Sequence, residues 1–186
     1  MKSAELRAAL ERCPLVAAIQ ENAFAAALRS PVEAIFDLSA NVLTVQERAA
    51  EAHAAGKVFL VHIDLADGVG KDKSGIAFLA KSGVDGIIST RSGLIRAAKD
   101  AGLVTVQRFF ALDSKGVQNI SDMIDSVRPD VVEIMPGVIG KVISRFANGN
   151  IPVIAGGLVE TKAEVTTAIA CGALGVSTGC EQLWYL

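Results

Sequence analysis

The stretch VFLVHIDLADGVGKDKSGIAFLAKSGVDGIISTRSGLIRAAKDAGLVTVQRF, residues 58–109, decides the fold of this chain. It holds three short apolar segments, at 58–65, 86–90 and 103–109, whose composition indicates buried strands. Two segments with helical patterning, at 73–81 and 92–100, lie between them and stop at a glycine, which is typical of helix ends. Strands that alternate with helices form parallel sheets, because each helix carries the chain back to the start of the next strand.

The same alternation continues in both directions. Toward the N-terminus, the pattern predicts strands at 14–19 and 34–38, helices at 23–29 and after Thr44 as the candidate N-cap, and an additional helix at 3–12. Toward the C-terminus, it predicts strands at 130–135, 152–155 and 175–178, with helices at 117–127, 138–147 and 161–170. Eight strands favour a compact (β/α)8 barrel of the TIM type, formed by residues 1–186 as a single domain. An open doubly wound sheet is the alternative, although it rarely uses eight strands this short.

The composition limits the class of protein. Residues are 51% hydrophobic, but no apolar run approaches the ~18 residues that span a bilayer. The charged start, Met-Lys-Ser-Ala-Glu, is unlike a signal peptide. The lack of an apolar run of that length indicates no membrane partner. Three cysteines without a CxxC pair indicate a reduced, cytoplasmic setting. The net charge of −2 and pI near 5.7 lack the basic character of many nucleic-acid binders, so any nucleic-acid role needs a local patch.

Glycines and hydroxyl residues follow the last two predicted strands. Gly156 and Gly157 come after the seventh strand, and Ser177, Thr178 and Gly179 come at the end of the eighth. Glycines allow the backbone to approach an anion closely, amides at a following helix start point toward negative charge, and the two hydroxyls are further donors. Loops after strands seven and eight of such barrels frequently bind phosphate. The sequence therefore predicts a phosphate site here; the alternative is a tight turn followed by a helix cap.

Further polar residues lie at the ends of other predicted strands, where barrels of this type place their sites. They are His62 and Asp64 on strand three, Arg91 after strand four, Gln107 on strand five and Glu133 on strand six. We expect them to line a small polar pocket together. His62 and Asp64 could contact a ligand or transfer protons. Alternatively, they form a satisfied buried pair, and each of the others could be a surface or turn residue.

Several chemistries are disfavoured. Two histidines make a histidine-rich metal site improbable. No lysine ends a predicted strand, which argues against a Schiff-base aldolase, and neither a GxSxG nor a Walker A motif is present. The sequence thus argues against a metal site and a Schiff-base lysine. That the chain has no catalytic residue and no cofactor is an expectation that rests on a family resemblance.

Several of these strings together resemble the glycerol-3-phosphate-responsive antiterminator family. They are His62-Ile-Asp-Leu-Ala-Asp-Gly68 with Asp72, Gly86-Ile-Ile-Ser-Thr-Arg91, Gln107-Arg-Phe-Phe-Ala-Leu-Asp113, Asp130-Val-Val-Glu-Ile-Met-Pro-Gly137, Ala155-Gly-Gly with Thr161 and Val165, and Ser177-Thr-Gly-Cys-Glu-Gln-Leu-Trp184. The resemblance spans nearly the whole chain. One departure is Gly179-Cys180, where more polar residues are expected.

The resemblance implies a sensor rather than an enzyme. Such a protein binds glycerol 3-phosphate as its effector and acts on the leader mRNA of glycerol-uptake genes, where it prevents a terminator hairpin from ending transcription. Gly156, Gly157, Ser177, Thr178 and Gly179 would then hold the phosphate, and the other strand-end residues would line the pocket. An enzyme that acts on a small phosphorylated polyol or sugar is the alternative, because this fold hosts many such reactions.

The RNA contact is predicted only from local charge. Basic residues near the third to fifth loops are the candidates: Lys71, Lys73, Arg91, Arg96, Lys99 and Arg108. The alternative is an ordinary solvated charged face. A homo-oligomer would concentrate these groups, and the sequence itself does not show one.

Overall fold

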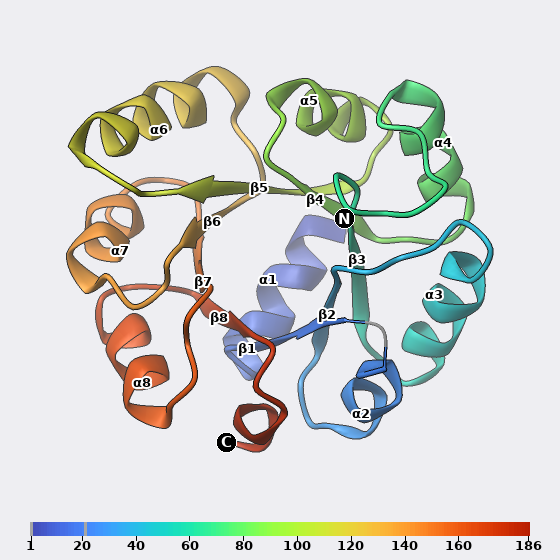
Figure 1. The fold of residues 1–186 in the computed structure, drawn as a ribbon, viewed down its shortest axis with the longest axis horizontal. Helices are drawn as coiled ribbons and strands as arrows, with labels where there is room; N and C mark the ends of the chain where they lie inside the picture. Colours follow the sequence, from blue (N-terminus) through green and yellow to red (C-terminus); the bar gives the residue numbers. More distant parts are fainter. Residues whose placement is uncertain (1, 21) are drawn as a thin grey trace.

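Eight parallel strands close into a barrel in the computed structural model, which describes residues 2–20 and 22–186. The strands are β1 (Leu15–Ile19), β2 (Ala34–Asp37), β3 (Val58–His62), β4 (Gly86–Ser89), β5 (Val104–Phe110), β6 (Val131–Met135), β7 (Val153–Gly156) and β8 (Gly175–Thr178). Each strand pairs with its neighbours in sequence, and β8 pairs with β1. The chain is therefore a (β/α)8 barrel of the TIM type, as predicted (Figure 1).

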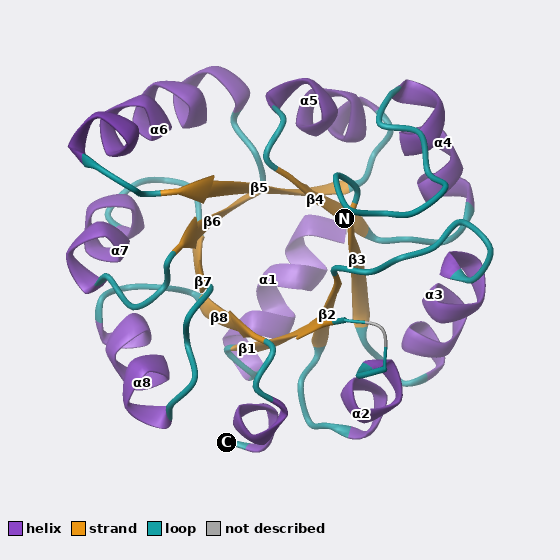
Figure 2. Ribbon diagram, viewed as in Figure 1, coloured by secondary structure: helices purple, strands orange, loops and turns teal. Residues whose placement is uncertain are grey.

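Helices surround the barrel between consecutive strands (Figure 2). They are α2 (Phe24–Arg29), α3 (Val45–Ala54), α4 (Lys73–Lys81), α5 (Ser92–Asp100), α6 (Ser114–Val127), α7 (Gly140–Ala147) and α8 (Lys162–Ala170). In place of an eighth surrounding α-helix, a 3₁₀ helix, η1 (Glu181–Tyr185), follows β8. The sequence pattern did not predict η1, whose five residues are too few for a helical period to show.

The first helix, α1 (Lys2–Arg12), lies across the N-terminal end of the barrel. It contacts β2, β3 and β5, which belong to different sides of the ring. Leu6 and Leu10 are fully buried against the interior residues Val16, Leu60 and Val104. Figure 1 accordingly shows α1 behind the centre of the ring, so the mouth at the C-terminal strand ends faces the reader.

Strand residues alternate between two cores. Phe36, Leu60 and Ile88 point into the barrel, whereas Ile35, Phe59 and Ile87 belong to the core between strands and helices. Because both faces are buried, the strands are apolar almost throughout. Three polar side chains from β5, β6 and β8 interrupt this apolar pattern and bind one another: Arg108, Glu133 and Ser177.

Helix caps define where α4 and α6 begin. Asp72 caps α4 at its predicted start by accepting from Gly75 N, whereas Asp113 caps α6 ahead of the predicted start at 117 by accepting from Gly116 N. Thr44 precedes α3 as predicted, but its side chain makes no cap hydrogen bond. Instead, the Oδ1 atom of Asn41 accepts from Leu43 N at 2.9 Å in the preceding turn. None of the described helices is long and apolar enough to cross a membrane.

Candidate ligand-binding site

A cavity of about 730 Å³ opens at the mouth of the barrel, between the ends of β1, β7 and β8. Its lining includes Gly157, Leu158, Thr178, Gly179 and, from β5, Arg108. The other residues that line the cavity are Ala18, Gln20, Ala23, Leu38, Met135, Val159, Glu160, Ser177 and Cys180. Both glycine-containing loops predicted from the sequence thus line one cavity.

The turn after β7 has a left-handed backbone, and two of its amides lack a backbone partner. Gly157 and Leu158 have φ angles of +74° and +60°, a left-handed conformation that glycine adopts readily and leucine rarely. The carbonyls of Gly156 and Gly157 accept from Gly137 N at 2.6 and 3.0 Å. In the described part of the chain, no backbone carbonyl accepts from the amides of Gly157, Leu158 or Gly179. These amides can bind an anion at the mouth.

The hydroxyls of Ser177 and Thr178 are already hydrogen-bonded within the protein. Ser177 Oγ donates to Glu133 Oε1 at 2.6 Å, and Thr178 Oγ1 donates to Val159 O at 2.7 Å. Thr178 Oγ1 also accepts from Cys180 N, and Thr178 O accepts from Trp184 Nε1. In this conformation the two hydroxyls fix the shape of the loop, and their role as donors to a ligand stays a prediction.

The N-terminus of α8 is covered by a side chain of its own helix. Glu164 Oε2 accepts from the amides of Glu160 and Thr161, both at 2.9 Å, and Thr161 completes the capping box. These hydrogen bonds, from Glu160 first, lower the pKa of Glu164. The amides of Glu160, Thr161 and Glu164 are therefore occupied, whereas the turn before them supplies amides that no backbone carbonyl binds.

A buried ion pair between Arg108 and Glu133 adjoins the cavity, which Arg108 lines and Glu133 does not. Arg108 Nε donates to Glu133 Oε2 at 2.6 Å, and the two side chains are 7% and 0% exposed. The strand register places Arg108 directly opposite Glu133. Ser177 binds the second oxygen of Glu133, so both carboxylate oxygens are occupied. Arg108 Nη2 is buried and has no partner among the described residues.

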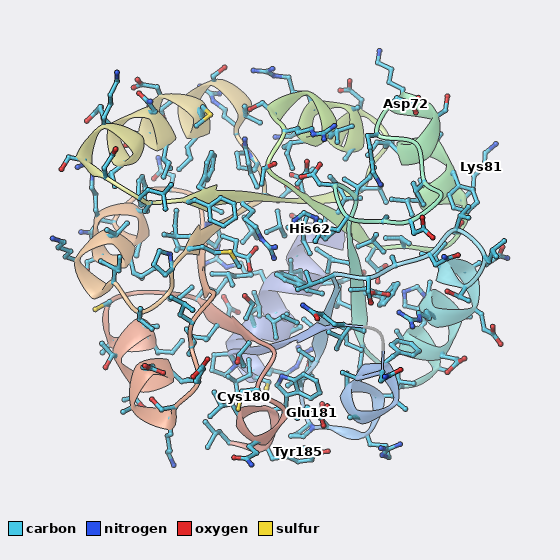
Figure 3. All side chains as sticks on the ribbon, in the orientation of Figure 1. His62, Asp72, Lys81, Cys180, Glu181 and Tyr185 are labelled. Atoms are coloured by element: carbon cyan, nitrogen blue, oxygen red, sulfur yellow. The ribbon has the colours of Figure 1, made fainter. Side chains whose placement is uncertain are left out.

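His62 lies inside the ring of strands (Figure 3), close enough to Arg108 and Glu133 for their charges to act on its pKa. It is 4% exposed, and its Nδ1 atom has no partner in the described structure. Burial, and then the positive charge of Arg108, lower the pKa of His62 to about 4. His62 is therefore neutral at pH 7, and one of its ring nitrogens can accept a hydrogen bond.

Gln107 and Arg108 point in the opposite directions to those predicted from the sequence. Gln107 points to the outer layer, where its Nε2 donates to Ser92 Oγ at 3.0 Å, and so does not line the pocket. Arg108, predicted as an RNA contact, points into the barrel and is 6% exposed. Both assignments were wrong for one reason: neighbouring strand residues face opposite sides, so an error of one residue exchanges them.

Asp64 and Arg91 organise the loop after β4. Asp64 accepts from Ser89 Oγ at 2.9 Å and from Thr90 N at 2.8 Å, and Arg91 Nε lies 3.6 Å from its Oδ1. Burial alone would raise the pKa of Asp64, but the hydrogen bonds from Thr90 and Ser89 outweigh it and lower that pKa. Both residues lie near the rim, but neither is part of the cavity lining that we expected them to share, and the same holds for His62 and Glu133.

The remaining candidate RNA contacts do not form one cluster. Lys71 donates to Ala66 O within the loop before α4, and Lys73 begins that helix. On α5, Arg96 donates to Ser126, whereas Lys99 donates to Arg128 O near the opposite end of the barrel. Their role in RNA binding stays a prediction. The described residues also contain no group of three or more His, Cys, Asp or Glu side chains that could hold a metal ion.

Comparison with known proteins identifies the family. Residues 15–184 match the model of the family described as glycerol-3-phosphate responsive antiterminator. The chain is similar to the uncharacterized protein YgcP of Escherichia coli K12, with 33% identity over 95% of this chain and 94% of that protein. A glycerol uptake operon antiterminator regulatory protein from Listeria monocytogenes is 34% identical, with a TM-score of 0.86 over 92% of this chain and 95% of that one. A glycerol uptake operon antiterminator-related protein from Thermotoga maritima is 31% identical, with a TM-score of 0.82 over 91% and 96%. The chain therefore belongs to the glycerol-3-phosphate responsive antiterminator family.

Proposed function

We propose that this protein senses glycerol 3-phosphate and, with the ligand bound, acts on the leader mRNA of glycerol-uptake genes to prevent termination of transcription. The observation that carries the proposal is the mouth cavity, where unoccupied loop amides lie above the buried guanidinium of Arg108. In a member of this family, it supports the binding of a small phosphorylated compound at this cavity. The ligand acts as an effector, and the proposal requires no cofactor and no metal.

The cavity suits a phosphate held at its outer edge. The amides of Gly157, Leu158 and Gly179 can donate to phosphate oxygens, which accept hydrogen bonds strongly because they are charged. Arg108 lies deeper in the same cavity, and Glu133 compensates its charge. A phosphate at the loops therefore leaves the carbon chain of the ligand pointing toward Arg108.

The site supports binding better than catalysis. An acid or base must reach the reacting group, whereas both oxygens of Glu133 are occupied by Arg108 and Ser177. In the described lining there is no lysine that could form a Schiff base. The alternative enzyme, acting on a phosphorylated polyol or sugar, predicts turnover; a sensor predicts none.

RNA binding is assigned to exposed basic residues, and Arg108 is not among them because it is buried. Lys71, Lys73 and Arg91 lie near the mouth, so an RNA held there would be close to the bound ligand. Ligand and RNA then strengthen each other's binding if the ligand favours the RNA-competent conformation, and the two effects must be equal.

The proposal is tested by titrating the leader RNA with and without saturating glycerol 3-phosphate at fixed salt concentration. We expect tighter RNA binding with the ligand, tighter ligand binding with the RNA by the same factor, and no chemical change in the ligand. The double variant Lys71→Gln/Lys73→Gln should weaken RNA binding and reduce its salt dependence while leaving ligand binding intact. Equal RNA affinities in both conditions would exclude the coupling, and consumption of the ligand would favour the enzyme.

A further inference from the structure

We propose that Arg108 and His62 form an inner subsite, below the phosphate loops, that recognises the hydroxyl groups of the ligand and makes the cavity selective for polyol phosphates. This inference rests on the proposed function, because it assumes that the ligand is a three-carbon phosphate. It assigns a specificity role to two side chains whose buried polar atoms are otherwise unexplained.

The first observation is the set of unsatisfied buried atoms. In the described structure, three buried side-chain nitrogen or oxygen atoms have no hydrogen-bond partner: His62 Nδ1, Gln107 Oε1 and Arg108 Nη2. Such atoms are rare, because burial without a partner costs free energy, and each requires an explanation. Gln107 lies in the outer layer beside Ser92, whereas His62 and Arg108 are buried inside the barrel. Arg108 lines the mouth cavity; His62 is not part of that lining, but it lies close enough to Arg108 for the charge of the guanidinium to act on its pKa. A ligand that reaches Arg108 therefore comes close to both unsatisfied side chains.

The second observation is that structural bonding uses only part of Arg108. Its ion pair with Glu133 is made through Nε, and Ser177 occupies the other carboxylate oxygen. Nη2 is therefore left over by the pair and lies in a side chain that lines the cavity. A guanidinium only donates hydrogen bonds, so its missing partner must be an acceptor.

The third observation is the chemical character of His62. Its pKa is lowered by the positive charge of Arg108 and raised by the charges of Asp64 and Glu133, so all three groups lie close enough to act on it. Because the ring is neutral, it has one donor and one acceptor nitrogen. A hydroxyl group can both donate and accept, and is thus suited to a site that contains a guanidinium donor and a neutral imidazole.

The loop amides and the two unsatisfied side chains lie at different depths in the barrel. The free amides of Gly157 and Gly179 lie in the loops beyond β7 and β8, whereas Arg108 and His62 lie within or at the ends of β5 and β3. A ligand with its phosphate at the loops extends its carbon chain inward. Its hydroxyls then approach the two unsatisfied side chains.

The test compares two ligands, glycerol 3-phosphate and n-propyl phosphate, which share the phosphate and chain length and differ in the hydroxyls. Calorimetric titration should show the wild-type protein preferring glycerol 3-phosphate by at least tenfold, the factor expected for one or two net hydrogen bonds. His62→Leu and Arg108→Lys should each weaken glycerol 3-phosphate about tenfold and change propyl phosphate by less than twofold. Arg108→Lys keeps the charge opposite Glu133 while removing Nη2. Gln107→Leu is the matched control, since it alters the third unsatisfied residue on the outer face of the same strand, and should preserve the preference.

The outcomes separate this inference from the proposed function. If the wild-type protein binds neither compound, the proposed function fails. If it prefers glycerol 3-phosphate and both inner variants keep that preference, the subsite is refuted and the function stands. An equal loss in Gln107→Leu would also refute it, because general disturbance of the core would then explain the effect. If Arg108→Lys fails to fold, the ¹⁵N chemical shift of His62 Nδ1 in the wild-type protein is measured instead. This shift should change on addition of glycerol 3-phosphate and not on addition of propyl phosphate. Equal changes with both ligands would overturn the proposal.

Discussion

Replacement of Gly156 by alanine should destabilise the barrel strongly, although it adds only one methyl group. A Cβ at this position would lie 2.5 Å from Ser177 Oγ and 2.6 Å from Glu133 Oε1, well inside contact distance. Neither atom can move away easily, because Glu133 is fully buried and held by Arg108 and Ser177. The methyl group must therefore separate Ser177 from Glu133 or displace β7.

The magnitude follows from these two effects. Forcing a methyl group into a packed interior costs about 1–3 kcal/mol. Losing a hydrogen bond to a buried charged group costs about 1.5–3 kcal/mol more. We expect a loss of about 3–5 kcal/mol in the free energy of unfolding, which lowers Tm by roughly 10 °C in a domain of this size. Binding of glycerol 3-phosphate should weaken as well, since Ser177 lines the cavity.

The matched control is the same substitution at Gly93. This residue is exposed within α5, and a Cβ there meets no atom within 4 Å. Gly93→Ala should stabilise the protein by roughly 0.5–1 kcal/mol, because alanine loses less conformational entropy in a helix. Urea denaturation of both variants measures the difference. If Gly156→Ala unfolds within about 0.5 kcal/mol of the wild type, the packing described for β6, β7 and β8 is incorrect.

Three further changes test other parts of the structure. Arg108→Met should cost about 3–5 kcal/mol in urea denaturation, because it leaves Glu133 buried without its cation, and the double variant Arg108→Met/Glu133→Gln should recover most of that loss. For His62, the pKa is about 4 in the folded protein and 6.5 when unperturbed, so the unfolded chain binds the proton more tightly. This difference in pKa contributes about 3 kcal/mol to the free energy of unfolding above pH 6.5, and the contribution is lost as the pH falls toward 4. Denaturation of His62→Leu across this pH range should lack that part of the pH dependence. Thr161→Ala should lower stability by about 1 kcal/mol through the lost cap on α8, and calorimetry should show unchanged ligand affinity.

The sequence pattern predicts the barrel well because each repeated unit carries several independent signals. An apolar strand, a helical period and a glycine or cap residue occur in nearly every unit, so an error in one boundary does not change the topology. The loops after β7 and β8 could also be located, since the eight-unit order determines which strands come last. Some helix boundaries differ between prediction and structure, for example the start of α6, but the order of the elements is the same.

Facing directions inside the site could not be predicted in the same way. Residues around Gln107 and Arg108 are apolar on both sides of β5, because parallel strands in a barrel are buried on both faces. Alternation of polarity, the usual guide to which residue points inward, is therefore missing. A carboxylate on the next strand, Glu133, was the available signal, because a buried arginine needs an acidic partner. The hydrogen bonds that Ser177 and Thr178 donate within the protein could not be predicted from the sequence, since they depend on distances between separate segments.

The helix α1 has a consequence for how fast a ligand can come and go. It covers one end of the barrel, so the mouth serves for both entry and exit. A macromolecule bound across that opening slows association and dissociation by the same factor and leaves the equilibrium affinity unchanged. Only contacts that differ between the empty and the occupied protein can alter the affinity. Measuring the lifetime of the bound ligand together with its affinity, with and without RNA, therefore distinguishes simple obstruction of the opening from true communication between the two partners.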